Sequence, residues 1–444
     1  MNSARNRELV ALVPVALLLT AGFTAVFAQE SARLDNLSLI YGAYFLAICL
    51  ATHIYLRMRL PNADPYLFPL VALLTAFGLV MVFRIDDELA RDQANWFVLG
   101  LVLFAMTIHF LRDYDVLERY RYTIAAIGIL LLLAPRLPGI GQQVNGAYLG
   151  VKLGPLQFQP AEFAKICLVV FLASYLREHR EVLIVGARRV LGVTLPPLKH
   201  FGPMLVVWGA SMFMLVFIRD LGSSLMFYAA FLALLYVATG RFSFVAIGMG
   251  MFLLGAWFFA STVPHVHDRV EIWLDPYQDP ANTGYQILNS IFAQADGGLF
   301  GQGFGQALIT IPGTDRALLP AAQTDTIYSL IVNEVGLFGG CAVVLIYLLI
   351  AARGFKIALL ADDGFSKLLA TGLTAVFAIQ AFVIIGGVTR VIPLTGVTLP
   401  FISYGGSSIV ANFVLLALLL LISDRARREA QAPIGGVVPA LGGS

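Results

Sequence analysis

The sequence has few charged residues and few cysteines. Only 13% of the 444 residues are charged and 59% are hydrophobic, whereas a soluble domain carries about 25% charged residues. No segment of domain size combines low hydrophobicity with high charge, so we expect no soluble domain. Cys49, Cys167 and Cys341 all lie in apolar runs and are not spaced as zinc ligands. We therefore expect small core residues there, and neither disulfides nor a zinc site.

Signatures of nucleotide and redox cofactors are also missing. The segment Gly298–Gly305 superficially resembles a phosphate-binding loop, but no Lys-Ser/Thr pair follows it. With no dinucleotide fingerprint and no Cys/His cluster, the sequence implies no nucleic acid, nucleotide or redox cofactor. Asp275, Asp279 and Asp296 are too loosely spaced to match a metal-site template, which leaves a divalent metal as an open question.

Long apolar runs dominate the chain instead. Runs of about 17–25 residues bounded by charges, Pro or Gly are long enough to cross a bilayer. We count about twelve such runs, near 9–28, 37–56, 67–83, 94–111, 122–135, 161–176, 201–218, 222–239, 242–263, 326–352, 368–388 and 405–422. The sequence thus predicts an all-α polytopic membrane protein, and we interpret the first run as a retained helix rather than a signal peptide.

Basic residues divide unevenly between the two sets of loops. Nineteen of the 29 lysines and arginines fall in the set that includes both termini, and ten lie in or beside the other set. The positive-inside rule therefore places both termini in the cytoplasm. Three polar, weakly periodic loops then lie outside and form the candidate working face, namely 136–162, 264–325 and 389–404.

The chain divides into three parts. Residues 1–60 are predicted to form an accessory N-terminal helical pair, and residues 61–425 a transmembrane core. Residues 426–444 are predicted to be a disordered cytoplasmic tail, because their end is rich in Gly, Pro and Ala. No internal repeat marks the chain as a transporter built from two related halves.

The stretch from Gly297 to Gly336 is polar and glycine-rich, unlike the rest of the chain. Near its end, Asp325 and Glu334 stand at the start of an apolar run, where ionisable groups are costly to keep. Asp325 directly precedes the predicted helix, so from the residues alone a helix N-cap is the simpler interpretation. Glu334 follows nine residues later, nearly on the opposite helix face, and is interpreted as the partner of a buried cation.

Two charged pairs lie near membrane depth. Glu162 and Lys165 are three residues apart on a predicted helix, so they share a face. Arg219 and Asp220 stand together at a helix end. Each pair either forms a simple ion pair or lines a polar cavity.

Several motifs together resemble one family. The segment from Pro393 to Ser408 holds two prolines and three glycines, which break a helix and predict a re-entrant connector or a loop beneath a polar cavity. As a string it resembles the signature of the RodA/FtsW/SpoVE (SEDS) family of bacterial shape, elongation, division and sporulation proteins. Further blocks resemble the family in the same order, namely Phe158-Gln-Pro-Ala-Glu-Phe-Ala-Lys165, Arg219-Asp-Leu-Gly-Ser-Ser224, Asp279-Pro-Ala-Asn-Thr-Gly-Tyr-Gln286, Gly298-Leu-Phe-Gly-Gln-Gly-Phe-Gly305, Gln323-Thr-Asp325 and Asn333-Glu-Val-Gly336.

The chain departs from the family pattern at three points. Tyr148-Leu149 stands where the family usually has Arg-Trp, directly after Asn145-Gly-Ala147. Thr326 follows Asp325, at a position where the family usually has an aromatic residue. The two helices predicted in residues 1–60 exceed the usual ten spans.

The resemblance implies a peptidoglycan glycosyltransferase that polymerises the lipid-linked precursor lipid II at the outer face of the bacterial cytoplasmic membrane. It also implies a class B penicillin-binding protein as partner. Asp325 matches the family's catalytic Asp, and we interpret it as the general base. The lack of long terminal extensions favours the cell-elongation branch over the division branch. The alternatives are a lipid II flippase and a non-catalytic scaffold for a penicillin-binding protein.

The departing diphosphate of such a substrate needs positive charge near it. Lys165 and Arg219 rank first among the outward basic residues, before Arg390, Arg269, Lys152 and Arg136. The resemblance and these charges together predict a substrate-binding set composed of Lys165, Glu162, Arg219, Asp220, Lys152, Arg390, Gln323, Thr324, Tyr404 and Ser407.

Overall fold

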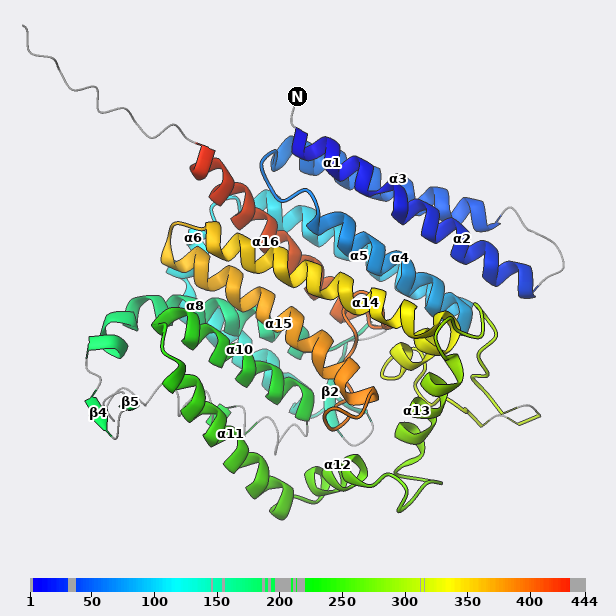
Figure 1. The fold of residues 1–444 in the computed structure, drawn as a ribbon. Coiled ribbons are helices and arrows are strands. Elements are labelled where there is room, and N and C mark those ends of the chain that lie inside the picture. Colours follow the sequence, from blue (N-terminus) through cyan, green and yellow to red (C-terminus); the bar gives the residue numbers. More distant parts are fainter. Residues whose placement is uncertain are drawn as a thin grey trace, which may run out of the picture.

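The computed structural model describes most of the chain. The described residues are 3–30, 37–144, 147–153, 156–185, 188–190, 193–195, 209–210, 213, 220–311, 313–314 and 316–431. Long helices lie side by side in a bundle, and irregular segments gather toward one end of it (Figure 1). The prediction of an all-α polytopic membrane protein is confirmed.

The first part of the chain, up to residue 185, supplies helices and a small sheet. Its elements are α1 (Ser3–Ala11), α2 (Val13–Glu30), α3 (Leu37–Arg59), α4 (Leu67–Ile85), α5 (Asp87–Phe110), α6 (Asp115–Arg119), α7 (Arg121–Leu133), the 3-10 turn η1 (Ala134–Arg136), strands β1 (Gly141–Val144), β2 (Ala147–Leu153) and β3 (Leu156–Phe158), and α8 (Pro160–Val185). Strands β1, β2 and β3 pair in that order as a small antiparallel sheet directly before α8.

The rest of the chain supplies the irregular face and several core helices. Its elements are strands β4 (Arg188–Val190) and β5 (Val193–Leu195), then α10 (Leu221–Thr239), α11 (Phe242–Thr262), α12 (Pro264–Leu274), α13 (Tyr285–Gly297), α14 (Ile327–Leu360), α15 (Gly364–Val388) and α16 (Gly406–Gln431). The predicted loop 264–325 therefore contains two helices, α12 and α13.

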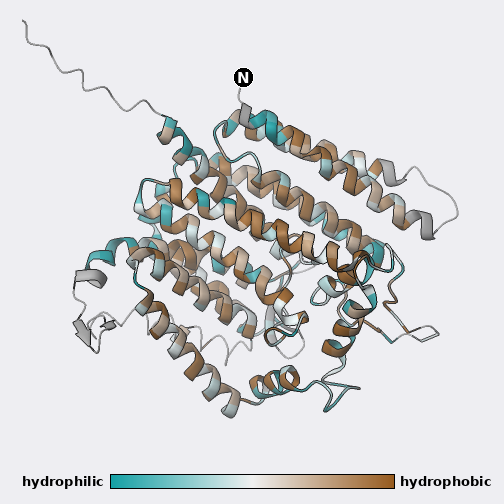
Figure 2. Ribbon diagram, viewed as in Figure 1, coloured by the Kyte–Doolittle hydropathy of each residue, from teal (hydrophilic) through white to brown (hydrophobic). Residues whose placement is uncertain are grey.

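Nine helices of the described residues are long and apolar enough to cross a membrane. Figure 2 shows their hydrophobic residues along the helix bodies and the polar residues mostly near the ends. Two further predicted runs fall on α7 and α8, which are not among the nine. Most of the predicted run 201–218 lies outside the described residues, so the number twelve stays a prediction.

Helix α16 is the central helix of the core. It is apolar on nearly all faces and packs against α5, α14, α8 and α15, as expected of a helix surrounded by others. In contrast, only Phe244, Gly248 and Gly255 of α11 are buried, and α11 lies with α12 at the edge of the bundle (Figure 1). Among the cysteines, Cys49 is buried as expected, but Cys341 is exposed because it faces outward from α14.

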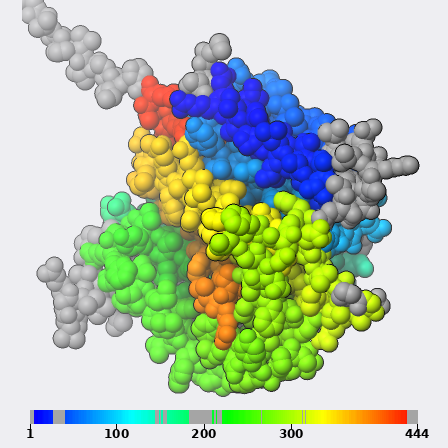
Figure 3. Space-filling view, turned by 45° about the vertical axis from the view of Figure 1, so that its right-hand side comes forward, coloured from blue at the N-terminus to red at the C-terminus, as the bar shows by residue number. Residues whose placement is uncertain are grey.

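Helices α1–α3 form a layer against the core. Figure 3 shows them in dark blue along one side of the molecule, and α2 packs on α4. A buried ion-pair cluster joins them to the core, because Arg5 pairs with Glu8 and donates to the Ala63 carbonyl. The next residue, Asp64, pairs with arginines of α14 and α16. Assigning residues 1–60 an accessory role stays a prediction.

Candidate functional site

The glycine-rich loop packs tightly against the first part of α14. Gly336 has φ 77° and interrupts the helix. Gln302 N donates to Asn333 O at 2.8 Å, and Leu337 N donates to Gly298 O at 2.9 Å. A side chain on Gly301 would place its Cβ 2.2 Å from the Glu334 carbonyl oxygen. Glycine is therefore required here both for positive φ and for close backbone approach.

Arg84 fastens the same loop to α4 and α14. Its Nη2 atom donates to Gly305 O at 2.6 Å and to Ala307 O at 3.0 Å. Its Nε atom lies 3.4 Å from Oε1 of Glu334, whose side chain is fully buried. Glu334 therefore has a cationic partner, as the sequence interpretation expected, but Arg84 is partly rather than fully buried.

Arg84→Ala is expected to lower the free energy of unfolding by about 3 kcal/mol, because the buried Glu334 carboxylate loses its counter-charge. The measurement is the melting temperature of purified protein in detergent. Arg57→Ala is the control, because Arg57 is an exposed arginine of α3. Equal melting temperatures for the two variants would show that Arg84 does not stabilise this region.

Asp325 lies in a tight turn before α14. Ala321 has φ 54°, and its carbonyl accepts hydrogen bonds from Thr324 N at 3.0 Å and Thr326 N at 3.2 Å. The N-cap residue of α14 is Thr326, and no side chain caps the first turn. The N-cap interpretation of Asp325 is therefore wrong, and its carboxylate is left available for another role.

The segment between α15 and α16 closes around this turn. Ser403 Oγ donates to Thr324 O at 2.7 Å, and Tyr404 N donates to Gln323 O at 2.8 Å. Gly396 has φ 74°, and a Cβ there would lie 3.7 Å from Oδ2 of Asp325. Two loops about 75 residues apart in sequence thus meet at Asp325, and Gln323, Thr324 and Tyr404 join them through backbone groups.

The environment of Asp325 makes its charged form less favourable than it is in water. The side chain is half-buried and lies before the first residue of the membrane-spanning helix. Loss of hydration raises the pKa of Asp325 to about 6, and the charge of Arg269 and a contact with the Thr324 side chain oppose this rise. The group is therefore a carboxylate that can gain and lose a proton near neutral pH.

Arg269 is the cation whose charge acts on Asp325. It lies on α12 and is half-buried, and its Nη1 atom donates to Leu394 O in the α15–α16 loop. Its charge also acts on Asp220 at the start of α10. The sequence ranked Arg269 behind Lys165 and left it out of the predicted set, because the approach of α12 to the turn before α14 is tertiary.

Lys165 belongs to a buried polar cluster. Its Nζ atom donates to Glu162 Oε2 at 2.5 Å and to Gln380 Oε1 at 2.7 Å, and lies 3.5 Å from Asn412 Oδ1. Gln380 in turn donates to the Thr398 carbonyl at 3.0 Å, which connects the cluster to the α15–α16 loop. The expected Glu162–Lys165 ion pair is present, and a role in substrate binding stays a prediction.

Asp220 acts as a helix cap in the structure. Its carboxylate accepts from Ser223 N at 2.9 Å and from Ser223 Oγ at 2.5 Å at the start of α10. Arg219 lies outside the described residues. The ion pair expected between these two residues is therefore not described, and their substrate-binding roles stay predictions.

The remaining predicted residues have separate structural contacts. Arg390 donates through Nε to Trp273 O at 2.8 Å and through Nη2 to Leu274 O, so its guanidinium caps the C-terminal end of α12. Ser407 Oγ accepts from Gln159 N at 2.9 Å and thereby joins α16 to the start of α8. Lys152 is exposed on β2. These contacts do not bring the three side chains to Asp325, and their binding roles stay predictions.

The structure gives a physical account of one departure from the family pattern. The guanidinium of Arg136 lies 3.9 Å from the centroid of the Tyr148 ring. An arginine and an aromatic ring are thus paired at the loop where the family usually has Arg-Trp. Here the arginine is Arg136 of η1, and the ring belongs to Tyr148. Such a pair is a cation–π interaction.

Carboxylates also gather on α12 and directly after it. Asp268, Glu271, Asp275 and Asp279 line a shallow pocket that is open to the surface. Asp279 accepts from Asn282 and Thr283, which lowers its pKa. Among the residues that the structure describes, no group of three or more His, Cys, Asp or Glu could hold a metal ion.

Known proteins similar to this chain include both RodA and FtsW proteins. The peptidoglycan glycosyltransferase RodA of Mycobacterium tuberculosis is 40% identical over 435 residues, which cover 96% of this chain and 91% of that protein. A probable peptidoglycan glycosyltransferase FtsW of Geobacter metallireducens is 33% identical and covers 79% of this chain and 92% of its own. The 96% coverage means that most of α1–α3 is shared with the mycobacterial protein.

A solved structure supports the same relationship. One chain of a peptidoglycan synthase complex that coordinates polymerization and crosslinking superposes with a TM-score of 0.65 at 28% identity. The superposition covers 82% of this chain and 98% of the other.

The fold and the site define a polytopic helical membrane protein with a half-buried carboxylate at one face of the bundle. The model of the cell cycle protein family of FtsW, RodA and SpoVE matches residues 65–428. The chain belongs to this family, and its similarity favours the RodA type.

Proposed function

We propose that this protein is a RodA-type peptidoglycan glycosyltransferase that polymerises lipid II into glycan strands during cell elongation. Family membership and the names of the relatives support the activity. The observation that carries the assignment of the site is Asp325, a half-buried carboxylate influenced by Arg269 and enclosed by the α15–α16 loop. This arrangement is suited to proton transfer within a partly desolvated site.

The proposed reaction forms one glycosidic bond and breaks one bond to diphosphate. A sugar hydroxyl of the acceptor attacks the anomeric carbon of the donor, and the polyprenyl diphosphate leaves with the electron pair of the broken C–O bond. Asp325 accepts the hydroxyl proton as the new bond forms. Arg269 keeps a positive charge near the carboxylate and is held in place by the Leu394 carbonyl.

The proposal places the Asp325 face outside the cytoplasmic membrane and both termini inside. The excess of basic residues in the terminal set of loops supports this orientation. A class B penicillin-binding protein is the proposed partner. The similarity to a chain of a peptidoglycan synthase complex supports such a partner.

The deciding experiment is polymer formation from purified lipid II in detergent, with and without the cognate class B penicillin-binding protein. We expect glycan strands on a gel when the partner is present. If no strands form but lipid II crosses the membrane of proteoliposomes that contain the protein, the flippase alternative is correct. If neither occurs while the partner still binds, the scaffold alternative is correct.

The rate of polymerisation is expected to fall as the pH drops through about 6, because protonated Asp325 cannot accept a proton. Well below that pKa the rate should fall about tenfold per pH unit. Initial rates over this range, with melting temperatures measured at each pH, separate loss of the base from unfolding. A rate that stays constant through pH 6 in folded protein would contradict Asp325 as the base.

A further inference from the structure

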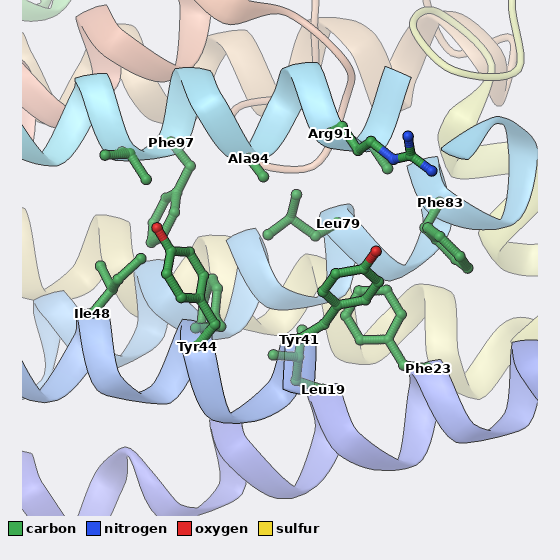
Figure 4. A pocket seen from close by; sticks show the side chains of 13 residues that line it. Leu19, Phe23, Tyr41, Tyr44, Ile48, Leu79, Phe83, Arg91, Ala94 and Phe97 are labelled. Carbon is green, nitrogen blue, oxygen red and sulfur yellow. The ribbon is translucent and has the colours of Figure 1, made fainter. Parts of the chain in front are cut away.

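A narrow apolar slot lies between the N-terminal helices and the core. Residues of α2, α3, α4 and α5 line it, and its empty volume of about 590 Å³ includes space that is open to the surroundings. Its inner wall includes the buried side chains of Leu19, Leu79 and Phe97. Arg91 is the charged residue in its lining (Figure 4). Because the slot lies among membrane-spanning helices, hydrocarbon chains are the abundant molecules that reach it.

Two stacked aromatic rings narrow the slot toward one end. The rings of Phe45 and Phe97 stack there with centroids 5.0 Å apart. Beyond them, Tyr55 Oη donates to Ala105 O at 2.8 Å and ties α3 to α5. From Arg91 to Val98 the slot follows α5 for about 10 Å, which is enough for part of one lipid chain.

The other end opens beside Arg91. Figure 4 shows Arg91 and Phe83 together at one end of the lining and Ile48 toward the other. Arg84 directly follows the lining residue Phe83 and binds the loop that carries Asp325 at Gly305. The open end of the slot and that loop therefore lie on the same side of the bundle. A lipid entering here therefore comes from the leaflet on the Asp325 side.

The slot is separate from the candidate catalytic site. Gln93 of α5 is buried and donates to Ser403 O at 3.0 Å in the loop around Asp325. Arg91 is two residues earlier, about 200° away around the helix. Arg91 therefore faces the N-terminal helices, and a phosphate bound to it lies on the opposite side of α5 from the Asp325 loop.

We propose that this slot binds one acyl chain of an anionic phospholipid, with the lipid phosphate on Arg91. The guanidinium is 67% exposed and pairs with Asp87 at 2.6 Å. That exposed pair is weak, and a guanidinium has five N–H donors, so a phosphate binds the donors that Asp87 leaves open. The exposed carboxylates of Asp86, Glu88 and Asp92 oppose this contact, so the apolar slot supplies most of the binding. The N-terminal helices thus form one wall of a structural lipid site.

The experiment uses the full-length protein in nanodiscs of equal phosphatidylglycerol and phosphatidylcholine, released into a native mass spectrometer. Ala94→Trp fills the slot, since Ala94 lines it, and Val102→Trp is the control, since Val102 is 49% exposed on α5 outside the lining. We expect the wild type and Val102→Trp to retain one phosphatidylglycerol. Ala94→Trp is expected to retain about tenfold less. If Ala94→Trp does not fold, Val98→Trp at the rim replaces it.

The headgroup contact is tested separately. Arg91→Gln is expected to lose the preference for phosphatidylglycerol over phosphatidylcholine, whereas Arg57→Gln, at an exposed arginine of α3 outside the lining, keeps it. Equal lipid retention by the slot-filling variant and Val102→Trp would overturn the site. An unchanged preference in Arg91→Gln would overturn the phosphate contact. Displacement of phosphatidylglycerol by added lipid II would show that the slot binds substrate, which also overturns the proposal.

Discussion

Asp325→Asn is expected to abolish glycan polymerisation while leaving the protein folded. An amide has nearly the same shape but cannot accept the hydroxyl proton, and loss of a general base lowers a rate by about 100-fold or more. Burial raises the pKa of Asp325 to about 6, so the folded protein disfavours its charged form. The neutral amide is therefore expected to keep or slightly raise the melting temperature.

The measurement is strand formation from lipid II with the partner present, beside the melting temperature of each variant. Asp296→Asn is the matched control, because Asp296 is an exposed carboxylate at the end of α13, before the same long loop. If Asp325→Asn polymerises at the rate of Asp296→Asn, Asp325 is not the base. The activity would then depend on another group.

Lys165→Met is expected to have the largest effect on stability. Its ammonium lies 2.5 Å from Glu162, and both side chains are at most 5% exposed. Removing one member of a buried pair leaves an uncompensated charge and lowers the free energy of unfolding by about 3–5 kcal/mol. Melting temperature and the fraction of monodisperse protein measure the effect.

The double variant Glu162→Gln with Lys165→Met is expected to recover much of the lost stability, since no unpaired charge remains. Lys152→Met, at an exposed lysine, is the control for which we expect no loss of stability. If Lys165→Met is as stable as the control but forms no polymer, Lys165 acts on the substrate rather than as a structural ion.

Much of the fold followed from the sequence because the bilayer sets the length and polarity of its helices. Predicted runs fall on α4, α10, α11 and α15 with boundaries close to those of the structure. Helix α16 instead continues to Gln431, so residues 426–431, predicted to be part of a disordered tail, are helical. Segments whose secondary structure depends on tertiary contacts were less predictable. Helices α12 and α13 lie in a stretch that the sequence describes as an outer loop, because short helices beside the membrane have no long apolar run.

The candidate site also contains contacts that the sequence predicted and contacts that it did not. The i,i+3 spacing of Glu162 and Lys165 placed both on one helix face, and the ion pair, one of the two alternatives that the sequence left open, is present. Gln380 and Asn412 complete that cluster from α15 and α16, more than 200 residues away, and no local pattern indicated them. Arg390 is a comparable case, because its guanidinium caps α12 through a tertiary contact.

By itself the sequence determined the membrane class, the main helices and the family, because hydropathy and contiguous motifs are local properties. Only the tertiary structure decided that Asp325 is not a helix cap, that Arg269 is the cation influencing it and that Arg84 fastens its loop. These features depend on which side chains meet after helices pack, and packing joins residues by shape and charge across distances that sequence spacing does not encode.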